Sequence, residues 1–154
     1  MEWRDGCDFL ELAIQEGIDS IVFSANSVVN KYGLVMGKGA ALRIRDAYPG
    51  ITGDFGKILD RRPPGDYHVI KVSRPETPSS VYALQVKRNY RDPGDFELCR
   101  QSLQKLTQML GDSQAVMNCP LIANGGFQDE KERVYEMIES ELENSPILVT
   151  RFGV

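Results

Sequence analysis

Apolar residues along this chain follow two alternating spacings, one typical of buried strands and one typical of amphipathic helices. Short apolar runs predict strands at 18–25, 67–72, 80–86, 115–119 and 147–151. Apolar residues recurring every three or four positions predict helices between Asp8 and Gly17, from Gly39 to Tyr48, around Phe55 to Leu59, from Phe96 to Leu110 and from Val134 to Leu142.

The order of these elements predicts the fold class. Helices separate most of the strands, so the sheet should be mostly parallel and covered by helices on both faces. The turn-rich segment 73–79 is too short for a crossover helix, so the strands on either side of it should be antiparallel. We therefore predict one α/β domain over residues 1–154, a three-layer α/β/α fold with a mixed, mostly parallel sheet.

Composition and charge narrow the classes of protein. The chain has 154 residues, 42% of them hydrophobic, which suffices for one buried core. A net charge of −4 argues against a general nucleic-acid-binding protein, which needs positive surface. No run approaches the roughly 18 apolar residues of a membrane span, and residues 1–5 do not resemble a signal peptide. We expect a soluble, cytoplasmic monomer that does not bind a membrane.

The cysteines and the single histidine give no metal or disulfide pattern. Cys7, Cys99 and Cys119 are widely spaced, and no Cys-x-x-Cys pair occurs. His68 lies in the alternating segment 66–72, which favours a structural role in a strand. We predict reduced, buried thiols, no metal and no cofactor.

The segment 24–45 has the pattern of an anion-binding loop. An apolar strand runs into a polar loop with Gly33, Gly37 and Gly39, which then opens a helix. Glycines let backbone N–H groups approach a ligand, and a helix N-terminus adds free donors. Two known phosphate-loop patterns fail here, because Lys38 is followed by no hydroxyl residue and Gly39 is followed by Ala-Ala-Leu. An ordinary strand-to-helix connection is the alternative.

A second glycine-rich segment, 120–128, follows the buried strand at 115–119. Both loops therefore leave the carboxyl ends of strands, where open α/β sheets bind ligands. The sequence predicts that the two loops meet at one edge of the sheet.

Four motifs in this order resemble the macrodomain family, and the resemblance covers nearly the whole chain. The motifs are Gly6-Cys7-Asp8, Ala25-Asn26 followed by Val35-Met36-Gly37-Lys38-Gly39-Ala40-Ala41, the strand 81–86 ending at Lys87-Arg88, and Pro120-Leu-Ile-Ala-Asn-Gly-Gly-Phe127. The resemblance implies that the chain binds ADP-ribose. It implies that Asp8 accepts a hydrogen bond from the adenine amino group, although Asp8 also suits a helix cap.

The same resemblance implies a diphosphate site between the two loops. Its ligand-binding residues would be Asn26, Met36, Gly37, Lys38 and Gly39 in the first loop and Asn124, Gly125, Gly126 and Phe127 in the second.

Lys87 is the predicted catalytic residue. Its position is similar to that of the catalytic lysine in the terminal ADP-ribose protein glycohydrolases and in the antitoxin macrodomains that remove ADP-ribose from DNA. A lysine whose pKa is lowered by burial, or by a neighbouring cation such as Arg88, can act as a nucleophile. The resemblance thus implies a hydrolase that reverses ADP-ribosylation, and an ordinary exposed charge at a strand end is the alternative.

Departures from the family pattern keep other functions open. Phe127 stands where the protein-directed branch has an aspartate, and Ala123 replaces the first glycine of its loop. Phe23 replaces an asparagine of the classical hydrolytic macrodomains. A non-catalytic reader of ADP-ribose and an ADP-ribose-1″-phosphate phosphatase, which processes Appr-1″-p, are the alternatives. The acceptor, whether protein, nucleic acid or nucleotide, is left open.

Overall fold

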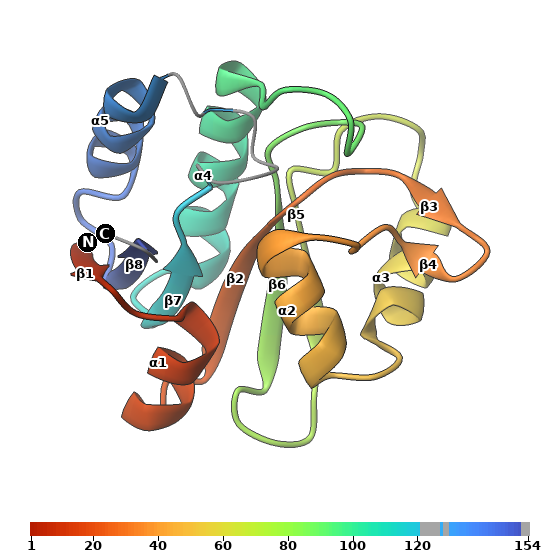
Figure 1. The fold of residues 1–154 in the computed structure, drawn as a ribbon, viewed down its shortest axis with the longest axis horizontal. Helices are drawn as coiled ribbons and strands as arrows, with labels where there is room; N and C mark the ends of the chain where they lie inside the picture. The colour runs from red at the N-terminus through yellow and green to blue at the C-terminus, as the bar shows by residue number, and fades with distance from the viewer. Residues whose placement is uncertain (121–126, 128–129, 152–154) are drawn as a thin grey trace.

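The computed structural model describes residues 1–120, 127 and 130–151, and these residues form a layered α/β structure (Figure 1). Its main sheet has the strand order β1-β8-β7-β2-β6-β5. The strands are β1 (Glu2–Asp5), β2 (Ser20–Ala25), β5 (Val69–Ser73), β6 (Ser80–Gln85), β7 (Ala115–Asn118) and β8 (Ile147–Arg151). All neighbouring pairs are parallel except β5 and β6, which are antiparallel as the short connection predicted.

Helices cover both faces of the sheet. They are α1 (Phe9–Glu16), α2 (Gly39–Ala47), α3 (Ile51–Asp60), α4 (Phe96–Leu110) and α5 (Lys131–Glu141). Side chains of α1, α2 and α3 share one buried cluster with Ile21 and Phe23 of β2, whereas side chains of α4 and α5 share a second cluster with Val22. Successive strand residues point to opposite faces, so β2 serves both clusters. The predicted three-layer α/β/α fold is confirmed.

Strand β1 was not predicted from the sequence. It pairs in parallel with β8 at the edge of the sheet, and its sequence, Glu-Trp-Arg-Asp, has no apolar run. Pairing with β8, rather than burial of its own side chains, places this segment in the sheet. A polar edge strand of this kind leaves no periodic signal in the sequence.

His68 was wrongly predicted to lie in a strand. Its φ of 62° is left-handed, and β5 begins only at Val69. The backbone N–H groups of Tyr67 and His68 both donate to the side-chain oxygen of Gln85, at 2.9 and 3.1 Å. The side chain of Gln85 thus replaces a backbone acceptor for these two N–H groups, while the carbonyl of His68 accepts from the backbone N–H of Gln85 at 2.8 Å.

The first glycine-rich loop contains a small hairpin, formed by β3 (Val29–Asn30) and β4 (Gly33–Leu34). The hairpin packs directly on α3, because Gly33 and Gly56 bring the two backbones into contact. The hydroxyl of Thr52 also donates to the carbonyl of Tyr32, at 3.2 Å. Helix α3 therefore supports the loop from behind.

None of the helices in the described part of the chain has the length and apolar character needed to cross a membrane.

Replacing Gly33 by alanine should destabilise the fold. Gly33 has a φ of +118°, and an added Cβ would overlap the backbone carbonyl of Thr52. We expect Gly33→Ala to lower the free energy of unfolding in urea by about 2–4 kcal/mol. Gly53→Ala is the control, because Gly53 lies within α3 and its nearest neighbour would be 4.0 Å away. Equal stabilities of the two variants would contradict this account of the hairpin.

Candidate functional site

The sheet divides at its carboxyl edge, between β2 and β7. The pairing of these two strands ends at Val22 and Met117, whereas β2 continues beside β6 as far as Ala25 and β7 continues beside β8 as far as Asn118. Strand ends that part in this way form a crevice at the carboxyl edge, which is where open α/β sheets bind ligands.

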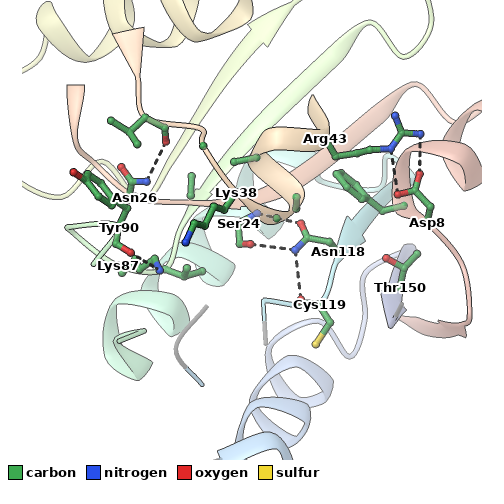
Figure 2. Close-up of a pocket in the computed structure, with 18 of the residues that line it drawn as sticks. Asp8, Ser24, Asn26, Lys38, Arg43, Lys87, Tyr90, Asn118, Cys119 and Thr150 are labelled. Carbon is green, nitrogen blue, oxygen red and sulfur yellow. Dashed lines mark hydrogen bonds and ion pairs between the residues drawn. The ribbon is translucent and has the colours of Figure 1, made fainter. Parts of the chain in front are cut away.

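A cleft of about 930 Å³ opens at this division. Six of the predicted site residues line it, namely Asp8, Asn26, Gly37, Lys38, Gly39 and Lys87. Figure 2 shows Asp8 with Arg43 on one side of the view and Lys87 with Tyr90 on the other, with Lys38 and Asn118 between them. The structure therefore brings residues from three of the four sequence motifs to one surface.

Asp8 is both a helix cap and a wall of the cleft. Its Oδ2 accepts a hydrogen bond from the backbone N–H of Glu11 at 2.9 Å, which caps α1. Its carboxylate is also paired with Arg43 of α2, with Nη2 to Oδ2 at 3.2 Å and Nε to Oδ1 at 3.4 Å (Figure 2). The Asp8 side chain remains 23% exposed, so a ligand can still reach it.

Asn26 shapes the first loop through its side chain. The amide nitrogen donates to the carbonyl of Val35 at 3.1 Å, and the amide oxygen accepts from the N–H of Val28 at 2.8 Å. The buried hydroxyl of Tyr67 donates to the backbone carbonyl of Asn26 at 2.5 Å. These contacts tie the start and the end of the loop together before it enters α2.

The N-terminus of α2 faces the cleft. Lys38 occupies the cap position, but its side chain makes no capping hydrogen bond, and the first turn contains no acidic residue. Gly39, Ala40 and Ala41 all line the cleft, and the first N–H groups of a helix have no acceptor within the helix. This helix end is therefore suited to an anion, since its dipole is positive there.

The charges around the cleft favour the same ligand class. Among the described residues that line it, Lys38, Arg43, Lys87 and Arg91 are cations and Asp8 is an acid. The protein as a whole has a net charge of −4, so this positive surface is local.

Lys87 is buried beside the end of β6. Only 6% of its surface is exposed, and its Nζ donates to the carbonyl of Tyr90 at 3.2 Å. Burial lowers the pKa of Lys87, because the ammonium loses hydration, and the negative charge of Asp92 partly opposes this change. The neutral amine is thus easier to form here than on an exposed lysine.

Arg88 does not lower the pKa of Lys87, which is the role that the sequence suggested for it. Its guanidinium binds both oxygens of Asp66, at 3.0 and 2.8 Å, and Oδ2 of Asp95 at 2.9 Å. Hydrogen bonds to Asp66 and then to Asp95 raise the pKa of Arg88. Because two carboxylates surround this cation, the lowered pKa of Lys87 comes from burial and not from Arg88.

Two predicted ligand-binding residues have their side chains in the core instead. Met36 is 2% exposed and belongs to the cluster beneath α2. Phe127 is 1% exposed, and its ring packs against Phe96 with 4.7 Å between centroids. Neither side chain lines the cleft in the described structure. Large apolar side chains gain more from burial than from a polar cleft, which explains where both side chains lie; the assignment of Met36 and Phe127 as ligand-binding residues stays a prediction.

Three further predicted residues, Asn124, Gly125 and Gly126, lie outside the described residues. Their assignment as ligand-binding residues stays a prediction.

Sequence reasoning missed several residues of the cleft. Arg43, Tyr90, Arg91, Asn118 and Thr150 line it without belonging to any predicted site. Tyr90 and Arg91 follow Lys87 closely in sequence, so their proximity could have been inferred. Arg43 and Asn118 reach the site only through the packing of α2 and β7, which no local pattern reveals.

In the part of the chain that the structure describes, no group of three or more His, Cys, Asp or Glu side chains could hold a metal ion. His68 lies outside the cleft lining and has its Nε2 3.2 Å from the side-chain oxygen of Gln101.

Comparisons with known proteins identify the fold. No family model matches this sequence, and no curated protein matches it either. The macrodomain of Thermus aquaticus DarG superposes with a TM-score of 0.77 and 22% identity, covering 97% of both chains. The macrodomain of Mycobacterium tuberculosis DarG gives a TM-score of 0.70 and 18% identity over 97% of both chains. Thermosipho africanus DarTG in complex with ADP-ribose gives 0.77 and 15% identity, covering 97% of this chain and 41% of that one.

The lowered pKa of Lys87 should appear in the pH dependence of stability. The unfolded chain restores the ordinary pKa of 10.5, so between the two pKa values the unfolded state binds more protons. The free energy of unfolding of the wild type should therefore rise relative to that of Lys87→Met as the pH approaches 10.5 from below. Urea unfolding of both proteins across the alkaline range measures this difference, and a difference independent of pH would contradict it.

Proposed function

We propose that this chain, which has the macrodomain fold, binds ADP-ribose in the cleft between Asp8 and Lys87. The observation that carries the proposal is the N-terminus of α2, which opens onto a locally positive cleft between these two residues. The similarity of this chain to a structure solved with ADP-ribose supports the same ligand.

Each part of the ligand has a matching group in the cleft. A diphosphate carries negative charge that suits the N–H groups at residues 39–41 and the cations beside them. The carboxylate of Asp8 accepts hydrogen bonds only, so it suits the adenine amino group. With the base at Asp8 and the diphosphate at α2, the distal ribose would extend toward Lys87.

We further propose that Lys87 is the nucleophile of an ADP-ribosyl hydrolase. The neutral Nζ would attack C1″ of the distal ribose, and the bond from C1″ to the acceptor would break with its electron pair on the acceptor. The proton lost by the nitrogen would pass to the acceptor or to water. Water would then hydrolyse the C1″–N bond and restore Lys87. Burial of Lys87 supports this role, because it favours the neutral amine that the attack requires.

A non-catalytic reader of ADP-ribose is the second candidate. Phe127 stands where the protein-directed glycohydrolases have an acidic residue, so position 127 provides no acid. The ring of Phe127 is buried against Phe96 instead. The negative charge of Asp92 raises the pKa of Lys87 and so opposes formation of the neutral amine, which does not favour the hydrolase.

The phosphatase alternative has the least support. It would require a histidine near the phosphate of ADP-ribose-1″-phosphate, and His68, the only histidine, contacts Gln101 outside the cleft lining.

Binding is tested by placing a negative charge at the proposed diphosphate site. Gly37 lines the cleft, has no left-handed φ, and an added Cβ would meet no atom within 4 Å. Gly37→Glu should therefore fold normally and weaken ADP-ribose binding by at least about tenfold, or about 1.4 kcal/mol, in calorimetry. Gly53→Glu makes the same change on α3, away from the cleft, and should bind like the wild type. Wild-type protein that gives no heat with millimolar ADP-ribose would exclude the proposed ligand.

Turnover is tested at Lys87. Lys87→Ala and Lys87→Arg should both abolish hydrolysis of ADP-ribosylated protein, DNA or nucleotide, because neither provides a neutral amine. Lys87→Ala should keep ADP-ribose affinity within about tenfold, since a nucleophile acts mainly in the transition state. The C1″–N adduct at Lys87 can open its ribose ring to an imine, so borohydride should reduce it and trap an ADP-ribosyl adduct in the wild type only.

Lys105→Ala is the matched control for this experiment. Lys105 is also a partly buried lysine with a lowered pKa, but its Nζ donates to the carbonyl of Tyr67 outside the cleft lining. This variant should retain full turnover. Wild-type protein that binds ADP-ribose tightly and hydrolyses none of these conjugates would establish the reader function.

A further inference from the structure

The side chain of Asn118 bridges the two strands at the point where the sheet divides (Figure 2). Its Oδ1 accepts a hydrogen bond from the backbone N–H of Ser24 at 3.1 Å, and its Nδ2 donates to the hydroxyl of Ser24 at 3.1 Å. The same Nδ2 lies 3.4 Å from the carbonyl of Cys119. Asn118 and Ser24 both line the cleft.

This side-chain contact takes the place of backbone hydrogen bonds between β2 and β7. Backbone pairing between β2 and β7 ends at Val22 and Met117, two residues before Ser24. In a continuing parallel ladder, the N–H of Ser24 would donate to a backbone carbonyl of β7. It donates instead to a side-chain carbonyl, which keeps the two backbones apart by the length of the asparagine side chain.

The chemistry of an amide suits this position. Asparagine offers both an acceptor and a donor, so it satisfies the N–H and the hydroxyl of Ser24 together. Aspartate would lose the donor and would add a negative charge to a cleft lined by cations. Alanine would leave the N–H of Ser24 without this acceptor, which costs free energy at a partly buried site.

We propose that Asn118 is a positioning residue that sets the width of the cleft for a diphosphate ligand. It fixes the distance between the end of β2, which leads to Asn26 and α2, and the end of β7, which leads into the second glycine-rich segment. This inference rests on the proposed binding of ADP-ribose. In this inference, Asn118 raises the affinity for a ligand that spans the cleft. It does so without contacting any one part of that ligand.

Two measurements on Asn118→Ala test the proposal. Hydrogen exchange of the Ser24 amide, followed by NMR, should become at least about tenfold faster than in the wild type. The affinity for ADP-ribose should fall by at least about tenfold, whereas affinities for AMP and for ribose 5-phosphate, which each occupy part of the cleft, should change by less than about threefold. If Asn118→Ala does not fold, Asn118→Ser serves instead, because its shorter side chain cannot reach across.

Asn30→Ala is the matched control. Asn30 also accepts a backbone N–H through its side chain, from Tyr32 at 2.9 Å, but it does not line the cleft. This variant should leave ADP-ribose affinity and Ser24 exchange unchanged.

The remaining outcomes separate failure of the positioning role of Asn118 from failure of the proposed ADP-ribose binding. Unchanged affinity for ADP-ribose in Asn118→Ala would overturn the positioning role. A loss for AMP or ribose 5-phosphate as large as that for ADP-ribose would also overturn it, because it would indicate direct contact with that part of the ligand. If the wild type does not bind ADP-ribose, the proposed ligand fails, and the inferred effect of Asn118 on its binding fails with it. Unchanged Ser24 exchange would then show that Asn118 does not hold the strands either.

Discussion

The parting of β2 and β7 at the carboxyl edge of the sheet is the constraint on which the rest of the site depends. The chain that leaves β2 continues into α2 and α3, which pack on one face, whereas the chain that leaves β7 continues into α5, which packs on the other face. Two neighbouring parallel strands whose chains turn to opposite faces must separate at their ends. The cleft follows from this connectivity, and the side chain of Asn118 spans the separation.

The segments around the cleft are held from behind by contacts that do not face a ligand. The hairpin of the first loop rests on α3 through Gly33 and Gly56, and Asn26 ties the two ends of that loop together. Beside Lys87, Arg88 bridges Asp66 and Asp95 in a similar way. These contacts hold the segments in place and leave the N–H groups at the start of α2 facing the cleft, whereas Arg43 is already paired with Asp8.

The burial of Lys87 and the positive charge of the cleft have different physical origins. Lys87 has a lowered pKa because the protein removes water from its ammonium, although its nearest hydrogen-bond partner is only a backbone carbonyl. The charge of the cleft instead comes from Lys38, Arg43 and Arg91 together with the end of α2. A negative ligand would therefore meet positive charge next to a lysine whose pKa is lowered by burial.

The sequence by itself determined the order of the main helices and strands, the antiparallel pair β5 and β6, and the place of the first glycine-rich loop at the carboxyl edge of the sheet. These features follow from local periodicity and from the length of connections, which a sequence contains directly. Tertiary structure alone decided the rest. Edge pairing created β1, backbone contact with α3 placed the hairpin, and core packing buried Met36 and Phe127. The pairing of Asp8 with Arg43 and the bridge from Asn118 to Ser24 join residues 35 and 94 positions apart, and only the packing of the layers brings them together.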